Sequence, residues 1–269
     1  MITRYRAWMD GTALDEIADS IYITDIVEPE TQVEVISLPL AGRSGSRLQS
    51  NHRRSKTVLI RLMIREYDVA ARKDVLNKVL TWAQGEALEI NDRDGLVLYV
   101  RLDNVPQISS LKWTETLTLS FTAWDVPYWM LSEMLPTGVV GGVTSVSLYA
   151  PGFGNAPAYV SVAVQNTGTT AIDAMTITVA ERYRIRLEGL ELTQNQIVVI
   201  GHNNAGPLLI VREQSGLDSV SLMDKRTPDS DDDLRSVPGE EYISCTVDVS
   251  YAGEAQTFNA LMGVRYLWL

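Results

Sequence analysis

Apolar and polar residues alternate with a period of two through much of the first half of the chain. Residues 58–64, 96–102 and 117–123 each place an apolar side chain at every second position. The positions between them in the last run are Thr116, Thr118, Ser120 and Thr122. One apolar and one polar face is the pattern of a half-buried antiparallel strand. We therefore expect three strands here, with Asp94-Gly95 forming a tight turn before the second.

One segment of the first half follows helical spacing instead. Its apolar residues are Val69, Val75, Leu76, Val79 and Leu80. Asp68 stands where an N-cap is favoured, and Gly85 stands where a helix commonly stops. The spacing predicts an amphipathic helix from residue 68 to about residue 83. The first half is thus expected to be a β-sandwich or open barrel that carries one helix.

Glycine and proline mark a boundary near the middle of the chain. Residues 133–157 contain Pro136, Gly138, Gly141, Gly142, Pro151, Gly152, Gly154 and Pro157. This density argues against regular structure. Short alternating runs resume after residue 158, without a helical pattern. We expect a mainly β protein with a first domain at residues 1–132, a linker at 133–157 and a second β-sandwich at 158–262.

The bulk composition fits a folded chain and excludes some functions. The 269 residues are 45% hydrophobic and 21% charged, close to ordinary globular proteins. Because no apolar run is long enough for a membrane span or a signal peptide, we expect a soluble, unsecreted chain without membrane insertion. The net charge of −11 argues against a protein that grips nucleic-acid phosphates. Most of that charge follows residue 130, where 16 acidic side chains stand against 8 basic ones.

A basic segment interrupts the strand pattern at residues 42–56. It contains four arginines, one lysine and almost no apolar side chain, so a core strand is excluded. We expect a long loop between two strands, and loops of this length are commonly functional or disordered. Three roles stay open: an arm that orders against a neighbouring subunit, a solvated loop, and a nucleic-acid contact.

The usual motifs for catalysis and metal binding are missing from the sequence. The two histidines, His52 and His202, have no partner at metal-ligand spacing, and neither a nucleophile elbow nor a phosphate-binding glycine loop is present. Cys245 falls on the apolar face of the run 242–250, so we expect a buried thiol rather than a nucleophile. We predict no enzyme, no cofactor and no catalytic or metal-binding residue, although 34 acidic residues leave a glycosidase pair open.

One acidic segment partly matches a calcium loop. Asp229, Asp231, Asp233 and Glu240 stand at the first, third, fifth and twelfth positions of such a loop. The match fails at Leu234, where the loop requires glycine, and strand-like sequence follows in place of a helix. An acidic loop between two strands is the favoured interpretation, and a weak calcium site is the alternative.

Aromatic residues gather in two short segments. These residues are Trp124, Tyr128 and Trp129 in one segment and Tyr266 and Trp268 in the other. The favoured interpretation is that they cap the cores at the domain junction. Exposed, they would instead be subunit contacts or platforms for sugar rings.

Several of these segments together resemble one family of phage proteins, the siphophage distal tail proteins. The resemblance rests on residues 67–76, Trp82, Gly85, 92–99 and 116–129 in the first half, and on residues 155–157, 166–168 and 237–242 in the second. The run 116–129 closes on Asp-Val-Pro-Tyr-Trp, which resembles the element that ends the N-terminal domain of that family.

The resemblance implies a tail-tube-like first domain, completed by a final strand at residues 263–269, and a galectin-like second domain. It also implies a homohexameric ring at the distal end of a phage tail, in the virion, after assembly in the host cytoplasm. The expected partners are the tail tube protein, a tail-tip hub or tail-associated lysin, and receptor-binding proteins. DNA would pass through the channel without specific binding. The alternative function is a carbohydrate-binding adhesin module of the tail tip.

Overall fold

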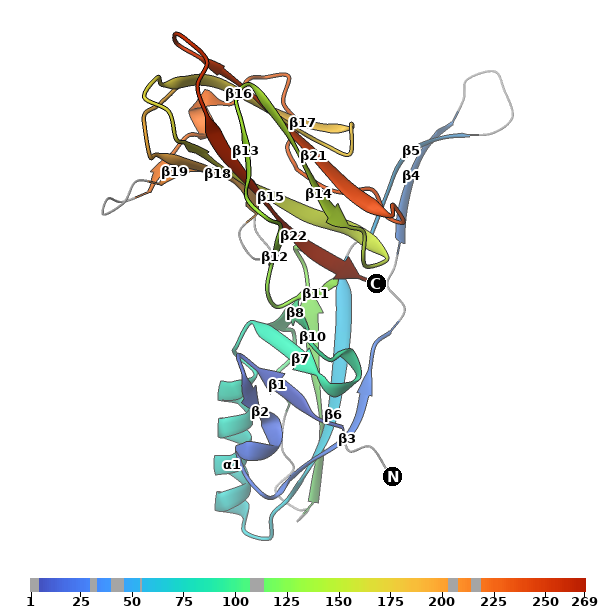
Figure 1. Ribbon diagram of the computed structural model, residues 1–269. Helices are drawn as coiled ribbons and strands as arrows, with labels where there is room; N and C mark the ends of the chain where they lie inside the picture. Colours follow the sequence, from blue (N-terminus) through green and yellow to red (C-terminus); the bar gives the residue numbers. More distant parts are fainter. Residues whose placement is uncertain are drawn as a thin grey trace. The chain divides into compact units, whose positions relative to one another are not determined.

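The chain divides into two compact units that are both mainly β, as predicted. The computed structural model describes residues 5–29, 33–39, 46–53, 55–106, 114–202, 208–213 and 219–269 (Figure 1). Unit 1 is Met1–Ser132 and unit 2 is Glu133–Leu269. Among the described residues, α1 (Val69–Trp82) is the one α-helix. No helix in these ranges is both long and apolar enough to cross a membrane.

Unit 1 contains two small antiparallel sheets and a separate two-stranded ribbon. The strand order is β2-β1-β7-β8-β11 in one sheet and β3-β6-β10-β9 in the other, and β4 and β5 make the ribbon. The bounds are β1 (Ala7–Met9), β2 (Thr12–Ala13), β3 (Ile21–Val27), β4 (Val33–Pro39), β5 (Ser46–Arg53), β6 (Lys56–Arg65), β7 (Ala87–Ile90), β8 (Leu96–Tyr99), β9 (Arg101–Leu102), β10 (Thr114–Ala123) and β11 (Trp129–Leu131).

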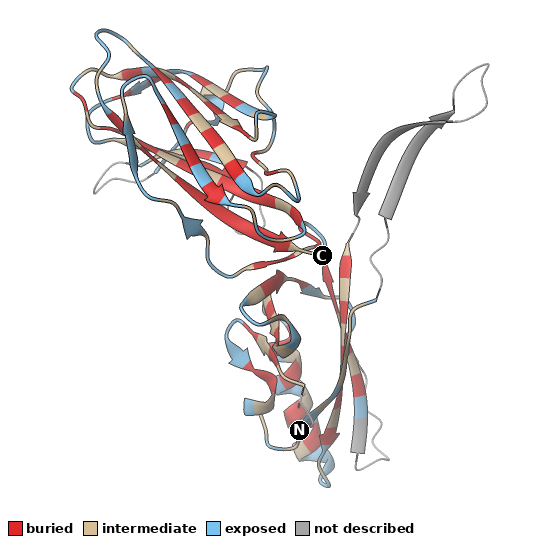
Figure 2. Cartoon of the chain, turned by 45° about the vertical axis from the view of Figure 1, so that its right-hand side comes forward, coloured by how far each residue is buried: buried red, intermediate tan, exposed pale blue. Residues whose placement is uncertain are grey.

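The long strands β6 and β10 form the centre of unit 1, and their predicted apolar faces are confirmed. The residues with no exposed surface include Val58, Ile60, Leu62, Ile64, Leu119 and Phe121 (Figure 2). Helix α1 packs against β6, and its Trp82 meets the Phe121 ring edge-on at 6.2 Å. The predicted N-cap is also confirmed, since the Asp68 carboxylate accepts a hydrogen bond from the Ala71 N–H at 2.8 Å.

The strand expected over residues 96–102 is instead divided between the two sheets. Its first part, β8, pairs with β7 and β11, whereas β9 pairs with β10. Val100 lies at the corner, where its N–H donates to Glu86 O at 2.8 Å. The change of sheet explains why Val97 and Leu98 are both buried, since a simple alternation would expose one of them.

Unit 2 is a β-sandwich of two antiparallel layers. One layer has the order β22-β15-β18-β19-β20, with β12 and β13 also paired to β22, and the other has the order β14-β21-β16-β17. The bounds are β12 (Leu135–Pro136), β13 (Val140–Gly142), β14 (Ser145–Pro151), β15 (Ala156–Asn166), β16 (Ile172–Val179), β17 (Tyr183–Leu192), β18 (Ile197–His202), β19 (Leu208–Glu213), β20 (Val220–Ser221), β21 (Tyr242–Tyr251) and β22 (Phe258–Trp268). Inward residues of both layers form the core seen in Figure 2.

The prediction of an irregular linker at residues 133–157 is wrong. This segment supplies β12, β13 and the whole of β14, which pairs with β21 over its full length. The residues Val146, Leu148 and Ala150 are buried and alternate with exposed neighbours. The glycines and prolines stand mainly at strand ends and turns, so they delimit strands here and do not prevent them.

Candidate assembly surface

The ribbon formed by β4 and β5 continues the β3–β6 pair (Figure 1). Val27 at the end of β3 lies opposite Leu59, and Val33 at the start of β4 lies opposite Arg53. Val33 lies six residues after Val27, and Arg53 lies six residues before Leu59. The β4–β5 ribbon therefore keeps the pairing register of β3 and β6. Among the described strands, none besides β4 and β5 pairs with either of them. Each strand thus presents one outer backbone edge to which another chain could bind.

The ribbon overturns part of the loop expected at residues 42–56. Residues 46–53 form β5, because a backbone ladder with β4 satisfies the polar groups without needing apolar side chains. Residues 42–45 and 54 lie outside the described part of the chain. His52 is a strand residue opposite Glu34. An isolated two-stranded ribbon is marginally stable in water, so a surface that covered it would stabilise it.

A partly buried ionic cluster lies at the base of the ribbon. Lys56 Nζ lies 2.8 Å from Glu28 Oε2, and Arg93 Nε lies 3.3 Å from Glu28 Oε1. Trp129 Nε1 donates a hydrogen bond to Glu28 Oε2 at 3.0 Å. Glu28 follows β3 directly and Lys56 opens β6, so these contacts tie both strands that lead into the ribbon to the body of unit 1.

The cluster favours the charged form of Glu28. Burial alone would raise the pKa of this carboxyl. Hydrogen bonds from Lys56 and Trp129, with the positive charges of Lys56 and Arg93, outweigh burial and leave the pKa of Glu28 lowered. The side chain of Lys56 is only 6% exposed, so each charge depends on the other for its burial.

The aromatic residues singled out in the sequence do not share one role. Trp129 and Tyr266 are buried, as the core interpretation predicted, and the Tyr266 hydroxyl donates to Pro151 O at 2.5 Å. Trp124, in contrast, is 61% exposed. Tyr128 and Trp268 are half-buried.

The carboxylates of the acidic segment 229–240 serve separate partners. Asp231 accepts a hydrogen bond from the Arg184 backbone N–H at 2.6 Å, and Asp233 Oδ1 lies 2.5 Å from His202 Nε2. Glu240 lines a pocket at one end of unit 2. Within the part of the chain that the structure describes, no three His, Cys, Asp or Glu side chains are grouped so that they could hold a metal ion. The segment fits the favoured interpretation of a loop between strands.

Cys245 and His202 lie inside unit 2. Cys245 is fully buried on β21, as predicted, and burial raises the pKa of its thiol to about 12. The His202 side chain is 7% exposed, and its ring lies 4.4 Å from the Tyr159 ring between centroids. Both residues therefore contribute to packing in unit 2.

Comparison with known proteins gives a match in fold alone. No family profile and no curated sequence matches the chain. The chain is similar to Dit (gp 19.1) of phage SPP1, described as a paradigm of the hub adsorption apparatus in phages that infect Gram-positive bacteria. The TM-score is 0.66 at 12% identity, over 98% of this chain and 100% of that one.

Two structures of the phage p2 baseplate in its activated conformation also match, one with Sr and one with Ca. Their TM-scores are 0.48 and 0.47 at 8% and 9% identity. They cover 97% and 99% of this chain, and 97% and 98% of theirs. The likeness to the SPP1 protein shows that the whole chain has a Dit-like fold.

Proposed function

We propose that this chain is a structural, non-enzymatic subunit of a phage tail. In this proposal it forms a homohexameric ring at the distal end of the tail and joins the tail tube to the tail-tip or baseplate hub. The observation that carries the proposal is the likeness to SPP1 Dit over essentially the full length of both chains. A match confined to one sandwich would fit many β modules, whereas this one includes both units in order.

Ring closure requires two different surfaces on each subunit, because rotational symmetry brings one patch of a subunit against another patch of its neighbour. The β4–β5 ribbon is suited to be one of them, since its edges have no third strand among the described residues. Contacts of obligate assemblies commonly bury about 2,000 Å² or more. A ribbon laid along the neighbouring subunit would add area that two globular faces lack.

The same assignment gives each unit a place in the virion. Unit 1 would surround the DNA channel, with the tail tube protein on one side and the hub or tail-associated lysin on the other. Unit 2 would face outward and carry receptor-binding proteins. Residues 1–130 carry 18 acidic and 15 basic side chains, a net charge of −3, so unit 1 has no excess of positive charge with which a channel wall would hold DNA phosphates. Assembly would take place in the host cytoplasm.

Light scattering with negative-stain imaging of the purified chain tests the ring. We expect a mass of six subunits and ring-shaped particles, formed either by the chain alone or after addition of the tail tube protein. A chain that stays monomeric in both conditions would contradict the proposal.

A ribbon deletion tests the arm separately. In this variant residues 31–54 are replaced by a short glycine-serine link, which the adjacent ends of β3 and β6 can accept because Val27 and Leu59 are paired. We expect a folded monomer whose tryptophan fluorescence is unchanged, because no tryptophan lies in the deleted segment. The control variant Asp25→Asn alters an exposed ion pair on β3 and should assemble normally. A ring that survives the deletion would refute the role of the ribbon while leaving the ring itself intact.

A further inference from the structure

The strand edges are protected on one side of the unit 2 sandwich. On that side the layers end in β17 and in β20, and β20 has only two residues. The loop at residues 226–231 closes the β17 edge. Its Thr227 N–H donates to Arg186 O at 3.0 Å, and its Asp231 N–H donates to another carbonyl of β17 at 2.7 Å. Short strands and covering loops are means by which proteins keep a sheet edge from pairing with another chain.

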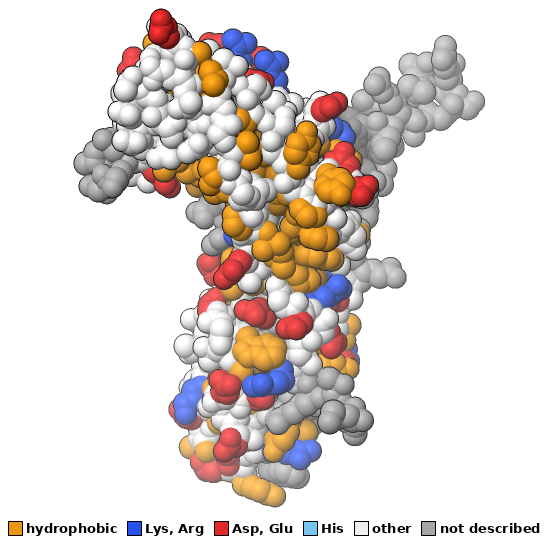
Figure 3. Space-filling model, viewed as in Figure 1, with side chains coloured by type: hydrophobic (Ala, Val, Ile, Leu, Met, Phe, Trp, Pro, Cys, Tyr) orange, Lys and Arg blue, Asp and Glu red, His pale blue; other side chains and the backbone are white. Residues whose placement is uncertain are grey.

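The opposite side of the sandwich ends in a longer strand. There β14, with seven residues, is the last strand of its layer, and β12 and β13 end the other layer. Residues 134–172 contain no Asp, Glu, Lys or Arg, although 21% of the whole chain is charged. Val139, Val143 and Tyr149 are 65%, 48% and 64% exposed. Figure 3 shows hydrophobic side chains over β13 and β14. This side therefore lacks the charges that commonly protect an edge.

The hydrogen-bonding groups at the outer edge of β14 follow from its pairing with β21. Thr144 O accepts a hydrogen bond from the N–H of Val249 on β21 at 2.8 Å. Backbone groups of successive residues in an antiparallel strand point to opposite sides, so the even-numbered residues of β14 face β21. Ser145, Ser147 and Tyr149 therefore direct their N–H and C=O groups away from β21. No other described strand pairs with β14 on that edge, so one more strand can add there.

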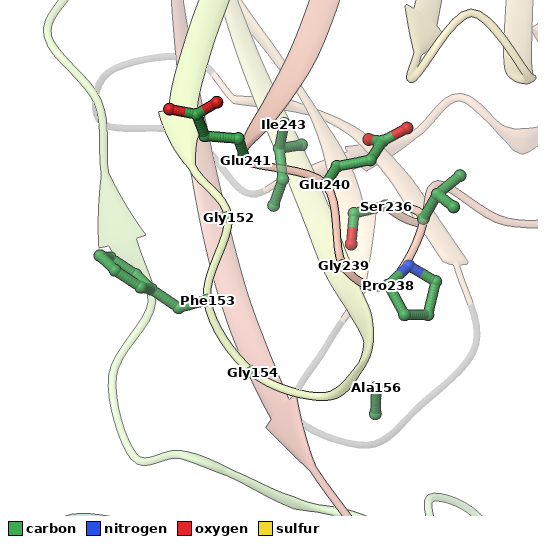
Figure 4. Close-up of a pocket in the computed structure, with 11 residues that line it drawn as sticks. Gly152, Phe153, Gly154, Ala156, Ser236, Pro238, Gly239, Glu240, Glu241 and Ile243 are labelled. Carbon is green, nitrogen blue, oxygen red and sulfur yellow. The ribbon is translucent and has the colours of Figure 1, made fainter.

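Acidic side chains lie at both ends of this edge. Asp248 is exposed on β21 opposite Ser145, and its carboxylate accepts a hydrogen bond from the Ser145 hydroxyl at 2.6 Å. Glu240 and Glu241 precede β21 at the other end, where Figure 4 shows their carboxylates pointing away from the pocket that their loop lines. The strands β14 and β21 contain no Lys or Arg. An added strand with basic ends and no acidic residue would complement these charges.

The β5 strand of the ribbon has this chemistry. Its sequence has Arg47 at the second position, Arg53 at the last, and no acidic residue. With eight residues, β5 is long enough to pair with the seven of β14. Its outer edge has no partner among the described strands. The other ribbon strand, β4, contains Glu34 and fits the acidic ends less well.

We infer that β5 of one copy pairs with the outer edge of β14 in a neighbouring copy. The inference rests on the proposed ring and names the second of the two surfaces that ring closure requires. Each subunit gives its ribbon to one neighbour and receives a ribbon from the other, which makes a heterologous contact that can close. The added strands extend the β14–β21–β16–β17 sheet and cover the exposed Val139, Val143 and Tyr149.

A proline in β14 tests the pairing. Ser147→Pro removes an N–H that points to the outer edge, and edge strands tolerate proline at such positions. We expect a folded chain with a melting temperature close to that of the wild type, but association at least about tenfold weaker by light scattering. The matched control Ser147→Ala keeps the N–H and should assemble like the wild type. If Ser147→Pro assembles as well as Ser147→Ala, the pairing is refuted while the ring stands.

Cross-linking identifies the two strands and does not depend on how Ser147→Pro folds. One full-length variant carries Ser50→Cys on β5 and a second carries Ser147→Cys on β14, so no chain has both introduced cysteines. The two are produced together and treated with a short bis-maleimide, to which the buried Cys245 should not react. We expect a cross-linked pair of chains from the mixture and none from either variant alone.

The cross-link separates failure of this contact from failure of the ring. Absence of the pair in the mixture overturns the inference, whether or not light scattering finds rings. A cross-linked pair without rings would support the contact and contradict the proposed ring. Pairs that form equally in either variant alone would show a different contact and would also overturn the pairing of β5 with β14.

Discussion

Substitution of Glu28 by glutamine tests whether the ionic cluster anchors the base of the ribbon. The change keeps the shape of the side chain but removes its charge, which leaves Lys56 with a positive charge at 6% exposure. Removing one partner of a buried pair costs about 3–5 kcal/mol. Because the side chains of Glu28 and Arg93 are 21% and 34% exposed, water would compensate in part. We expect unit 1 to lose about 2–3 kcal/mol of unfolding free energy.

Urea unfolding followed by tryptophan fluorescence measures this loss, since five of the six tryptophans lie in unit 1. The control is Asp25→Asn, which breaks an exposed pair with Arg61 and should cost less than about 1 kcal/mol. A second change, Lys56→Met in the Glu28→Gln background, removes the stranded charge and should recover much of the stability. If Glu28→Gln lowers the free energy of unfolding by no more than Asp25→Asn does, the cluster does not anchor the base of the ribbon.

The pH dependence of the same difference follows from the lowered pKa of Glu28. A carboxyl with a lowered pKa in the folded state binds protons less readily there than in the unfolded chain. Its contribution is fully present above the unfolded pKa of about 4.3, and it is lost as the pH falls through the folded pKa. We therefore expect the stability gap between wild type and Glu28→Gln to be constant near neutrality and to close below about pH 4.

Two further substitutions and one labelling experiment test other parts of the structure. Asp68→Ala removes the N-cap of α1 and should cost about 1 kcal/mol in urea unfolding. Phe121→Ala empties a fully buried position in β10 and should cost about 3–5 kcal/mol. Cys245 should not react with a thiol reagent at pH 8 in the native protein but should react in denaturant, because burial raises its pKa to about 12. Rapid native labelling would contradict its placement.

The elements that the sequence predicted correctly are those whose side-chain pattern and backbone partner agree. The apolar faces of β6 and β10 repeat at every second residue over residues 58–64 and 117–123, and α1 has both a periodic apolar stripe and a capping carboxylate. In such segments local propensity and burial favour the same structure. Neither needs information from a distant part of the chain.

The wrong prediction of a linker, and the strand and ionic cluster that were not predicted, have a different origin. Val146, Leu148 and Ala150 alternate with polar residues in the sequence, but the glycines and prolines on either side favoured an irregular linker. The segment forms a strand because it pairs with β21, which is distant in the sequence. The strand β5 has no apolar face to signal it. The cluster around Glu28 joins residues 28, 56, 93 and 129, and its members meet only after the sheets of unit 1 have formed. Pairing and ionic contacts at such separations leave no local pattern.

The features that folding alone does not require are the ones that point to function. The β4–β5 ribbon has no third strand in the described structure, and a two-stranded ribbon adds little stability by itself. Because the ribbon does little to stabilise the isolated chain, it is best explained by a surface that covers it. In the proposed ring, that surface would be the next subunit.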